Sequence, residues 1–342
     1  MITVHMFNLT IIIPIYNVEQ YILDCIQSVI AQLTDDIEVI CVDDGSTDHS
    51  IDVLSTYLKQ QPQTHIKNIK ILQQQNAGVA AARNLGIRHA QGKYLTFLDS
   101  DDVLLPAYAQ EIQRAIASDA DVISFGYQSL SEDLTPISHP FIPQQVLDQT
   151  QQHQQTLIDI FNVNLWFSGI HLYKASLFQG IEFPKLSHYE DAATIPDVIM
   201  QARSFYTIQA ALYGYRIRAS SATNCKNASN IDRSLQCLEQ LIPTLIEKTK
   251  AQVIFIIPLM HFFYIYIYQS TKFKNKQCAK HNWSKFAGAI QQLPQASDLI
   301  QNEHNRMLYH CLAFGLYGFY LSKFMSRLVR SIKKRLGRPY QR

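Results

Sequence analysis

Carboxylates gather at two points in the first hundred residues, each at the end of a short apolar segment. The segment YLTFLD ends in Asp99, and Asp101 and Asp102 follow. The segment IEVICVD ends in Asp43, and Asp44 follows. Carboxylates this close repel each other, which raises their pKa values unless a cation offsets the charge. Mg²⁺ and Mn²⁺ prefer oxygen ligands and often bind through one or two carboxylates and substrate phosphates, so the segment at Asp99 is a candidate site for such an ion with a nucleoside diphosphate.

Each acidic segment also has a plain structural interpretation. A lone D-x-D pattern is common, and a polar loop needs no ligand. In VDDGSTD, Gly45 fits a turn and Ser46 to Asp48 fit the start of a helix. That accounts for Asp48 better than for Asp43 and Asp44. A carboxylate of this pair is suited to accept the imide N–H of a uracil or a ribose hydroxyl.

Both acidic segments belong to a regular alternation of short apolar runs and longer helical patterns. Strands are expected over 9–15, 37–43, 66–72, 93–99 and 121–127, and helices over 18–32, 48–60, 77–90 and 106–118. Residues 131–165, with their prolines and the Gln-rich stretch QQVLDQTQQHQQ, are expected to be a loop or irregular connection. The alternation of strands and helices predicts an α/β fold with a mostly parallel sheet and helices on both faces. Such sheets bind ligands at the carboxyl ends of their strands, where both acidic segments fall.

Between the acidic segments lies NAGVAAARNLGI, residues 76–87, in which Arg83 and Asn84 interrupt a run of small and apolar residues. Two polar side chains on such a helix suggest a fixed role. One possibility is contact with a ligand. The other is that Arg83 is the structural partner of a buried carboxylate.

The order IIIPIYN, VDDGSTD, NAGVAAARNLGI and YLTFLDSDD resembles the family-two glycosyltransferases of the GT-A fold, which make bacterial surface polysaccharides and related glycans. The later segments LWFSGIHLYKASLF, FPKLSHYEDAA and YGYRIRASSATN resemble further motifs of that family. The resemblance implies a GT-A domain over residues 8–225, with a donor-binding half at 8–130 and an acceptor-side half at 131–225.

The resemblance also implies roles for individual residues. In an inverting transfer, Asp191 would be the general base that takes the proton of the acceptor hydroxyl, and Glu190 would help to orient the substrate. Asp101 would be the direct ligand of Mn²⁺ or Mg²⁺, with Asp99 as the other half of the D-x-D motif. Pro14 and Tyr16 would line the nucleotide base of the donor, Asp44 would accept a hydrogen bond from that base, and Asp43 would support the same loop. Arg83 would lie near the nucleotide base and the phosphates. Asp99 would contact the donor at the metal, and Arg218 and Ser221 would contact the diphosphate.

The expected reaction moves a sugar from a nucleotide-diphosphate donor, expected to be a UDP-sugar, to a hydroxyl of a glycan or lipid-linked acceptor. Some segments depart from the family pattern. The aromatic residue that often follows E-D is missing from EDAATIP, and Gly169 to His171 replace a usual lysine. The Q-x-x-R-W motif of processive synthases is absent, which favours single addition over polymerisation.

A helical C-terminal region is expected over 230–342. The segment VIFIIPLMHFFYIYIY (253–268) is shorter than the roughly 20 residues of a membrane span and predicts a buried helix or a membrane-contacting surface. The tail, 323–342, has eight Lys or Arg and no Asp or Glu. Its apolar and basic residues segregate as in an amphipathic helix on an anionic membrane surface; packing on its own domain is the alternative.

The expected location is cytoplasmic and peripheral, on the inner face of the plasma membrane. The six cysteines are scattered without a C-x-x-C pair, as is typical of reduced thiols. No basic region precedes the first apolar run, so no signal peptide is expected. The net charge of +2 becomes −6 without the tail, which indicates one localised anionic partner and no nucleic acid.

Other functions fit parts of this pattern. A sugar nucleotidyltransferase shares the α/β layout but needs a Gly-rich phosphate loop near the N-terminus, where IIIPIYNVEQ offers none. Dinucleotide oxidoreductases and P-loop NTPases likewise lack their glycine motifs here. The non-enzymatic rival is a family member that binds a nucleotide-sugar without turnover.

Overall fold

A computed structural model describes residues 7–143, 147–148, 153–164, 166–218, 227–317 and 320. The chain divides into two compact units. The N-terminal unit comprises Met1–Leu157 and Trp166–Cys225, and the C-terminal unit comprises Ile158–Leu165 and Lys226–Arg342. Residues 158–165 thus group with the C-terminal unit. The expected bounds of the GT-A domain, 8–225, and of its two halves stay predictions.

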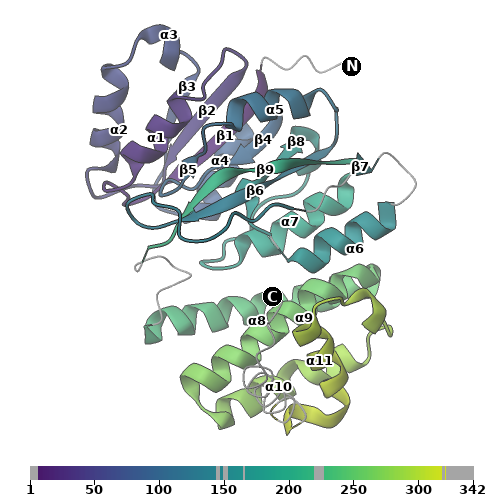
Figure 1. The fold of residues 1–342 in the computed structure, drawn as a ribbon. Helices are drawn as coiled ribbons and strands as arrows, with labels where there is room; N and C mark the ends of the chain where they lie inside the picture. The colour runs from purple at the N-terminus through teal and green to yellow at the C-terminus, as the bar shows by residue number, and fades with distance from the viewer. Residues whose placement is uncertain are drawn as a thin grey trace, which may run out of the picture. The chain divides into compact units, whose positions relative to one another are not determined.

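The N-terminal unit is built on a mixed sheet with the strand order β3-β2-β1-β4-β8-β6-β9-β5, and β7 pairs with β9 (Figure 1). β1 runs parallel to β2 and β4, β2 to β3, and β6 to β9. β8 is antiparallel to β4 and β6, and β5 and β7 are antiparallel to β9. The strands are β1 (Phe7–Ile15), β2 (Ile37–Asp43), β3 (Ile69–Gln73), β4 (Gly92–Phe97), β5 (Val103–Leu104), β6 (Val122–Leu130), β7 (Leu147–Asp148), β8 (His171–Lys174) and β9 (Phe205–Arg216).

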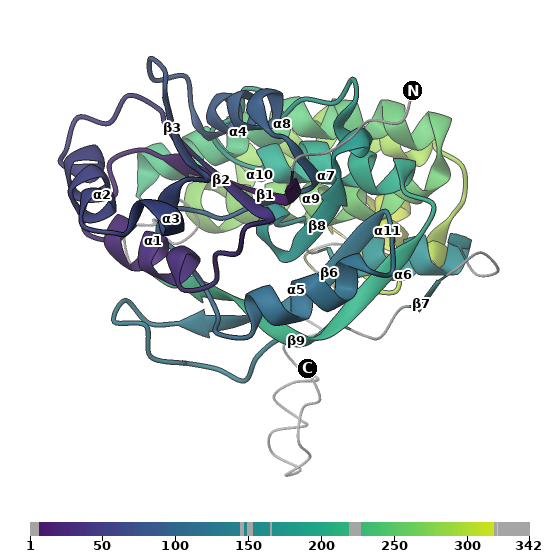
Figure 2. The ribbon, with the colours of Figure 1, turned by 90° about the horizontal axis from the view of Figure 1, so that it is seen from above.

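Helices cover both faces of this sheet (Figures 1 and 2), as a parallel sheet of nearly continuous apolar strands requires. β2 is buried along its whole length, which is why IEVICVD shows no polar alternation. The helices of the unit are α1 (Ile22–Ile30), α2 (Ser50–Lys59), α3 (Gln63–Ile66), α4 (Val79–His89), α5 (Tyr108–Ile116), α6 (His153–Val163), which continues into the C-terminal unit, and α7 (Glu190–Gln201). The short 3₁₀ helices η1 (Ser168–Ile170) and η2 (Ala175–Phe178) flank β8.

Two sequence-based expectations differ from the structure. The strand expected at 66–72 begins only at Ile69, because Gln63–Ile66 forms the short helix α3. Residues 131–165 were expected to be irregular, but α6 occupies His153–Val163 and begins at the end of the Gln-rich stretch. Glutamine favours helices, and Leu157 and Phe161 place two buried side chains one turn apart on a common face.

The C-terminal unit is helical, as expected. Its helices are α8 (Ala228–Ala251), η3 (Val253–Phe255), α9 (Ile256–Gln269), the π-helical turn η4 (Ser270–Lys274), α10 (Lys276–Gln291), η5 (Ser297–Leu299), α11 (Glu303–Cys311) and η6 (Leu312–Phe314). Val253–Lys274 is the only described segment whose length and composition would suit a membrane span, and 61% of its apolar window is buried within the protein. The basic tail at 323–342 lies outside the described residues.

Close packing of α4 on β1 yields a prediction. A Cβ on Gly86 would lie 2.4 Å from Cγ2 of the buried Ile12, so Gly86→Ala should overpack the core and lower the free energy of unfolding by about 1–3 kcal/mol. Gly288 in α10 is the matched control, because its added Cβ meets no described heavy atom within 4 Å. Gly288→Ala should be neutral or stabilising by up to about 1 kcal/mol. Urea unfolding followed by circular dichroism compares them, and equal stability of wild type and Gly86→Ala would contradict this packing.

Candidate active site

The carboxyl ends of β1, β2 and β4 meet at one edge of the sheet. The parallel register pairs Ile15 with Asp43 and Ile12 with Phe97, so the segments after these strands leave the sheet close together. The acidic turn, Asp99 to Asp102, leads from β4 to β5 at this edge. The alternation seen in the sequence therefore does bring the two acidic segments to one side of the sheet.

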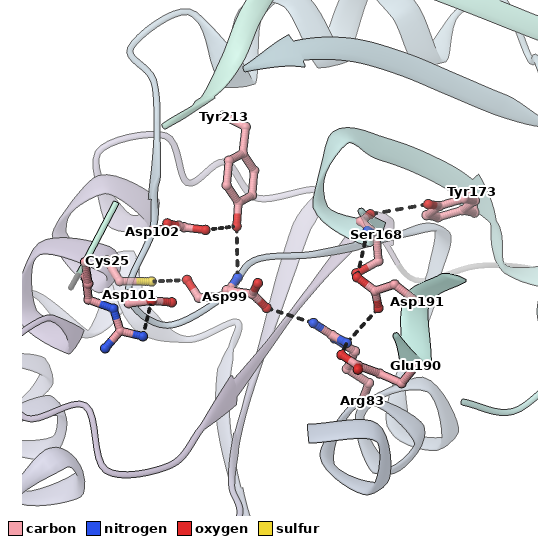
Figure 3. Close-up of polar contacts among 11 residues, drawn as sticks. Cys25, Arg83, Asp99, Asp101, Asp102, Ser168, Tyr173, Glu190, Asp191 and Tyr213 are labelled. Atoms are coloured by element: carbon pink, nitrogen blue, oxygen red, sulfur yellow. Dashed lines mark hydrogen bonds and ion pairs between the residues drawn. The ribbon is translucent and has the colours of Figure 1, made fainter. Parts of the chain in front are cut away.

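The buried guanidinium of Arg83 joins the acidic turn to the first residues of α7 (Figure 3). Its Nη1 donates to Oε1 of Glu190 at 2.8 Å and to Oδ1 of Asp191 at 2.7 Å. Its Nη2 donates to Oδ1 of Asp99 at 2.9 Å. Arg83 itself is 2% exposed, and its guanidinium carbon lies 5.5 Å from the centre of the Phe183 ring. The structure thus matches the alternative in which Arg83 is the partner of buried carboxylates, and all three of these contacts are to acidic side chains.

Asp191 is held from both sides. Oδ1 accepts from Arg83, and Oδ2 accepts from the backbone N–H and the hydroxyl of Ser168 at 3.2 and 3.3 Å. Burial raises the pKa of Asp191 to about 7, opposed by the charge of Arg83 and reinforced by those of Glu190 and Asp99. A carboxyl group with a pKa near neutrality is suited to exchange a proton at physiological pH.

Asp101 forms an ion pair with Arg218, which follows the end of β9. The Arg218 guanidinium also lies over the ring of Tyr21, 4.7 Å from its centre. Burial raises the pKa of Asp101, as does the charge of Asp99, whereas Arg218 acts in the opposite direction. Positive charge at this carboxylate is therefore favourable, and Arg218 provides it here.

The acidic turn carries the type of ligand atoms that Mg²⁺ and Mn²⁺ prefer. The side chains of Asp99 and Asp101 offer hard oxygen ligands and are 30% and 18% exposed. Over the residues that the structure describes, no group of three or more His, Cys, Asp or Glu is arranged to hold a metal. In proteins, Mg²⁺ is usually held by one or two carboxylates together with substrate phosphates. Arg218 would have to release Asp101 for such binding.

Asp102 fixes the shape of the turn. It is 1% exposed, and its Oδ2 accepts from the hydroxyl of Tyr213 at 2.6 Å. Its Oδ1 accepts from the backbone N–H of Arg216 at 2.7 Å. The Tyr213 hydroxyl in turn accepts from the N–H of Asp99 at 3.2 Å. The third carboxylate of the cluster thus ties the turn to β9.

Asp43 and Asp44 organise the segment after β2. Asp43 accepts from the N–H of Ser46 at 2.9 Å. Asp44 is 2% exposed and accepts at 2.8 Å from the N–H groups of Ala77 and Gly78, just before α4. Its Oδ1 also accepts from the side chain of Gln74 at 2.7 Å. Asp44 therefore anchors the start of the helix that carries Arg83, and three of its acceptor positions are in use.

The remaining expected donor residues lie at the same edge or outside the described part. Pro14 is buried in β1, and Tyr16, just after β1, is 47% exposed. The segments after β1 and β2 are tied together, since the N–H of Val18 donates to the Ser50 hydroxyl at 2.8 Å. Ser221 lies outside the described residues.

Several residues that shape the site had no distinct signal in the sequence. Tyr213 and Ser168 act through contacts to carboxylates far away in the chain. The guanidinium groups of Arg216 and Arg218 lie over the ring of Tyr21, and the Tyr21 hydroxyl donates to Glu132 at 2.7 Å. Ser168 and Tyr213 lie within segments that resemble family motifs, but neither those motifs nor the residues around Tyr21 indicate these contacts.

Comparison with curated proteins gives the family. Residues 10–171 match the model of glycosyl transferase family 2. The putative glycosyltransferase EpsH of Bacillus subtilis is 33% identical over 217 residues, 62% of this chain and 61% of EpsH. The putative teichuronic acid biosynthesis glycosyltransferase TuaG of the same organism is 28% identical over 218 residues, 64% of this chain and 82% of TuaG. The match covers a smaller part of some relatives: it spans 31% of the length of glycosyltransferase GlyA of Streptococcus pneumoniae.

Solved structures share the fold. The crystal structure of S. aureus TarS 1–349 in complex with UDP-GlcNAc has a TM-score of 0.67 at 19% identity, covering 98% of this chain and 93% of that one. The mannosyltransferase PcManGT from Pyrobaculum calidifontis, in complex with GDP-Man and Mn²⁺, has a TM-score of 0.53 at 17% identity, with coverage of 93% and 87%. The GT-A expectation for the fold is confirmed by the TarS likeness. Residues 10–171, which include the acidic turn, therefore belong to glycosyl transferase family 2.

Proposed function

We propose that the protein is an inverting glycosyltransferase that moves a sugar from a nucleotide-diphosphate donor, a UDP-sugar, to a hydroxyl of a glycan or lipid-linked acceptor. The observation that carries this proposal is the juxtaposition, through Arg83, of the acidic turn with a carboxyl group whose pKa is about 7. Relatives named for teichuronic acid and minor teichoic acid biosynthesis support a role in surface-polysaccharide synthesis. A TarS structure with UDP-GlcNAc supports the uridine donor.

Asp191 is the general base of the proposed reaction. Its carboxylate takes the proton of the acceptor hydroxyl as that oxygen attacks the anomeric carbon, a contribution of typically about 10²–10⁴-fold. Glu190, paired with the same guanidinium nitrogen, keeps the start of α7 oriented toward the acidic turn. The sugar–phosphate bond breaks on the opposite face of the sugar, so the configuration at the anomeric carbon is inverted.

Asp101 and Asp99 are the proposed holders of Mn²⁺ or Mg²⁺. When bound there, the cation supplies Lewis-acid stabilisation of the departing diphosphate. Arg218, released from Asp101, is long enough to pair with a phosphate oxygen instead. Ser221 is the other residue assigned to the diphosphate. Tyr16, Pro14 and the remaining acceptor capacity of Asp44, supported by Asp43, are assigned to the nucleoside.

Two substitutions separate the metal side from the base side. Asp101→Ala and Asp191→Asn should each lower the transfer rate by at least about 10²-fold with the fold retained. Mn²⁺-dependent binding of UDP, measured by calorimetry with and without chelator, should be lost only in Asp101→Ala. Exposed Asp52→Ala on α2 is the matched control and should behave as wild type.

Near wild-type turnover of Asp191→Asn would refute the base assignment. Purified wild-type protein that binds UDP-sugars with Mn²⁺ but neither transfers nor hydrolyses them would favour the non-catalytic alternative. A screen of nucleotide-sugars by thermal shift, with and without Mn²⁺, identifies the donor for these assays.

The raised pKa of Asp191 sets the expected pH dependence. Only the carboxylate form can accept a proton, so below a pKa of about 7 the rate at saturating substrates should fall about tenfold per pH unit. Above that pH the rate should level off. A pH–rate profile with fixed Mn²⁺ and donor concentrations tests this, and an acidic limb centred near pH 4, the ordinary range of aspartate, would be the wrong result.

We further propose a cytoplasmic, peripheral location on the inner face of the plasma membrane, through the basic tail at 323–342. The supporting observation is charge: residues 226–342 have a net charge of +13, and residues 1–225 of −11. Tyr320, just before the tail, has its hydroxyl 3.5 Å from that of Thr271, beside the exposed Lys272. A basic segment gains about 1 kcal/mol per Lys or Arg near an anionic bilayer.

Truncation after Ser322 tests this location. Sedimentation with vesicles containing anionic phosphatidylglycerol should capture the full chain and not the truncated one, and neutral phosphatidylcholine vesicles should capture neither. High salt should weaken the capture, because surface electrostatics are screened. Equal capture of both proteins would count against the tail and favour its packing on its own domain.

A further inference from the structure

The adjacent residues Arg83 and Asn84 both contact the segment that ends in the E-D pair. Asn84 is 9% exposed and makes two hydrogen bonds to the backbone of Phe183. Its Nδ2 donates to the Phe183 carbonyl, and its Oδ1 accepts from the Phe183 N–H, both at 2.9 Å. One residue earlier, Arg83 binds Glu190 and Asp191. The two side chains therefore hold both ends of the segment from Phe183 to Asp191.

We propose that Arg83 and Asn84 are positioning residues that set the distance between the general base and the donor phosphates, and that Arg83 is not a donor contact. The inference rests on the proposed function. It is an alternative to the expectation, drawn from the family resemblance, that Arg83 lies near the nucleotide base and phosphates of the donor. It also adds Asn84, for which the sequence suggested only a fixed polar role.

The first argument is geometric. The planar guanidinium spans two groups of carboxylates with its two terminal nitrogens, Glu190 and Asp191 on Nη1 and Asp99 on Nη2. A planar fork fixes the relative orientation of its partners, which the single ammonium of lysine does not. Asp99 belongs to the proposed metal turn, so the same side chain touches the donor side and the base side.

The second argument is electrostatic. Three carboxylates share one buried cation, and their side chains are only 30%, 13% and 17% exposed for Asp99, Glu190 and Asp191. Without the cation these groups repel each other, and the start of α7 and the acidic turn would move apart. The phenylalanine ring 5.5 Å from the guanidinium carbon adds a cation–π contact and limits the motion of Arg83.

The third argument concerns what anchors Arg83. The N–H groups of Ala77 and Gly78, just before α4, are held by Asp44 at the end of β2. On the other side, Gly86 lets α4 pack directly on Ile12 of β1. The helix α4 is thus held by Asp44 at its start and by packing on β1 at Gly86. It is a rigid support for Arg83 and Asn84.

The geometry has a direct kinetic consequence. In-line displacement needs the reacting atoms within about 3–3.5 Å, and a misplacement of about 1 Å can cost about 10²-fold in rate. A residue that only positions the base should therefore change kcat strongly and donor binding little. A donor contact should change both.

Arg83→Lys and Arg83→Met test this separation. Both should lower kcat by about 10²-fold or more, with the Kd for UDP, by calorimetry in the presence of Mn²⁺, changed by less than about threefold. Asn84→Ala should lower kcat by about tenfold, again with little change in Kd. Arg88→Met is the matched control on the same helix, since the Arg88 side chain is 56% exposed and its nearest acidic partner is 3.8 Å away.

Chemical rescue distinguishes positioning from general loss of structure. Millimolar guanidinium should restore part of the rate of Arg83→Ala, because the ion can occupy the space among the three carboxylates. Guanidinium should not restore the rate of Asp191→Asn. Circular dichroism and thermal unfolding identify any variant that fails to fold. If Arg83→Ala or Arg83→Met fails to fold, the kcat and Kd values of Arg83→Lys, which keeps a cation, and of Asn84→Ala test the positioning role.

A loss of UDP affinity in Arg83→Met as large as its loss of kcat would overturn the inference and return Arg83 to the donor site. Wild-type kcat in Arg83→Met or Arg83→Lys would also overturn it. In either case an active wild type leaves the proposed function standing. An inactive wild type that binds UDP would instead remove the proposed function, a distinct outcome.

Discussion

The arrangement of the candidate site depends on one buried cation shared by three carboxylates. Burial of a charge is costly unless it is paired, and loss of one partner leaves the others uncompensated. Arg83 therefore makes the positions of Asp99, Glu190 and Asp191 interdependent, although Asp99 lies 16 positions and Glu190 107 positions from Arg83 in the chain. The rest of the N-terminal unit can be understood as the support of that guanidinium: the sheet aligns the strand ends, Asp44 anchors α4, and Asn84 holds the segment before α7.

Much of this could be predicted from the sequence, because it follows from local pattern. The apolar runs gave β1, β2 and β4 nearly at their observed bounds, and parallel pairing then required Asp43 and Asp99 to lie at one edge. A charged residue on a helix of small side chains indicated a fixed role for Arg83. Family resemblance supplied the E-D pair, which residue pattern alone would have described as an acidic helix start.

Other features depend on pairing between distant segments and left no local trace. Nothing near Asp102 indicates that Tyr213, 111 positions later, donates to it. The ion pair of Asp101 with Arg218 and the contact of Ser168 with Asp191 are of the same kind. The sequence did not indicate the helix α6, because the glutamines and prolines in residues 131–165 obscure the buried positions Thr156, Leu157 and Phe161.

The anchoring of Asp102 by Tyr213 and Arg216 has a consequence for ligand affinity. Since these hydrogen bonds lie within the protein, the acidic turn keeps its backbone conformation without a ligand. Binding then avoids the cost of immobilising a loose loop, which is about 0.5–1.5 kcal/mol for each side chain that must be ordered. The turn is preorganised, and the affinity for a phosphate-bearing ligand reflects its contacts more fully than it would on a mobile loop.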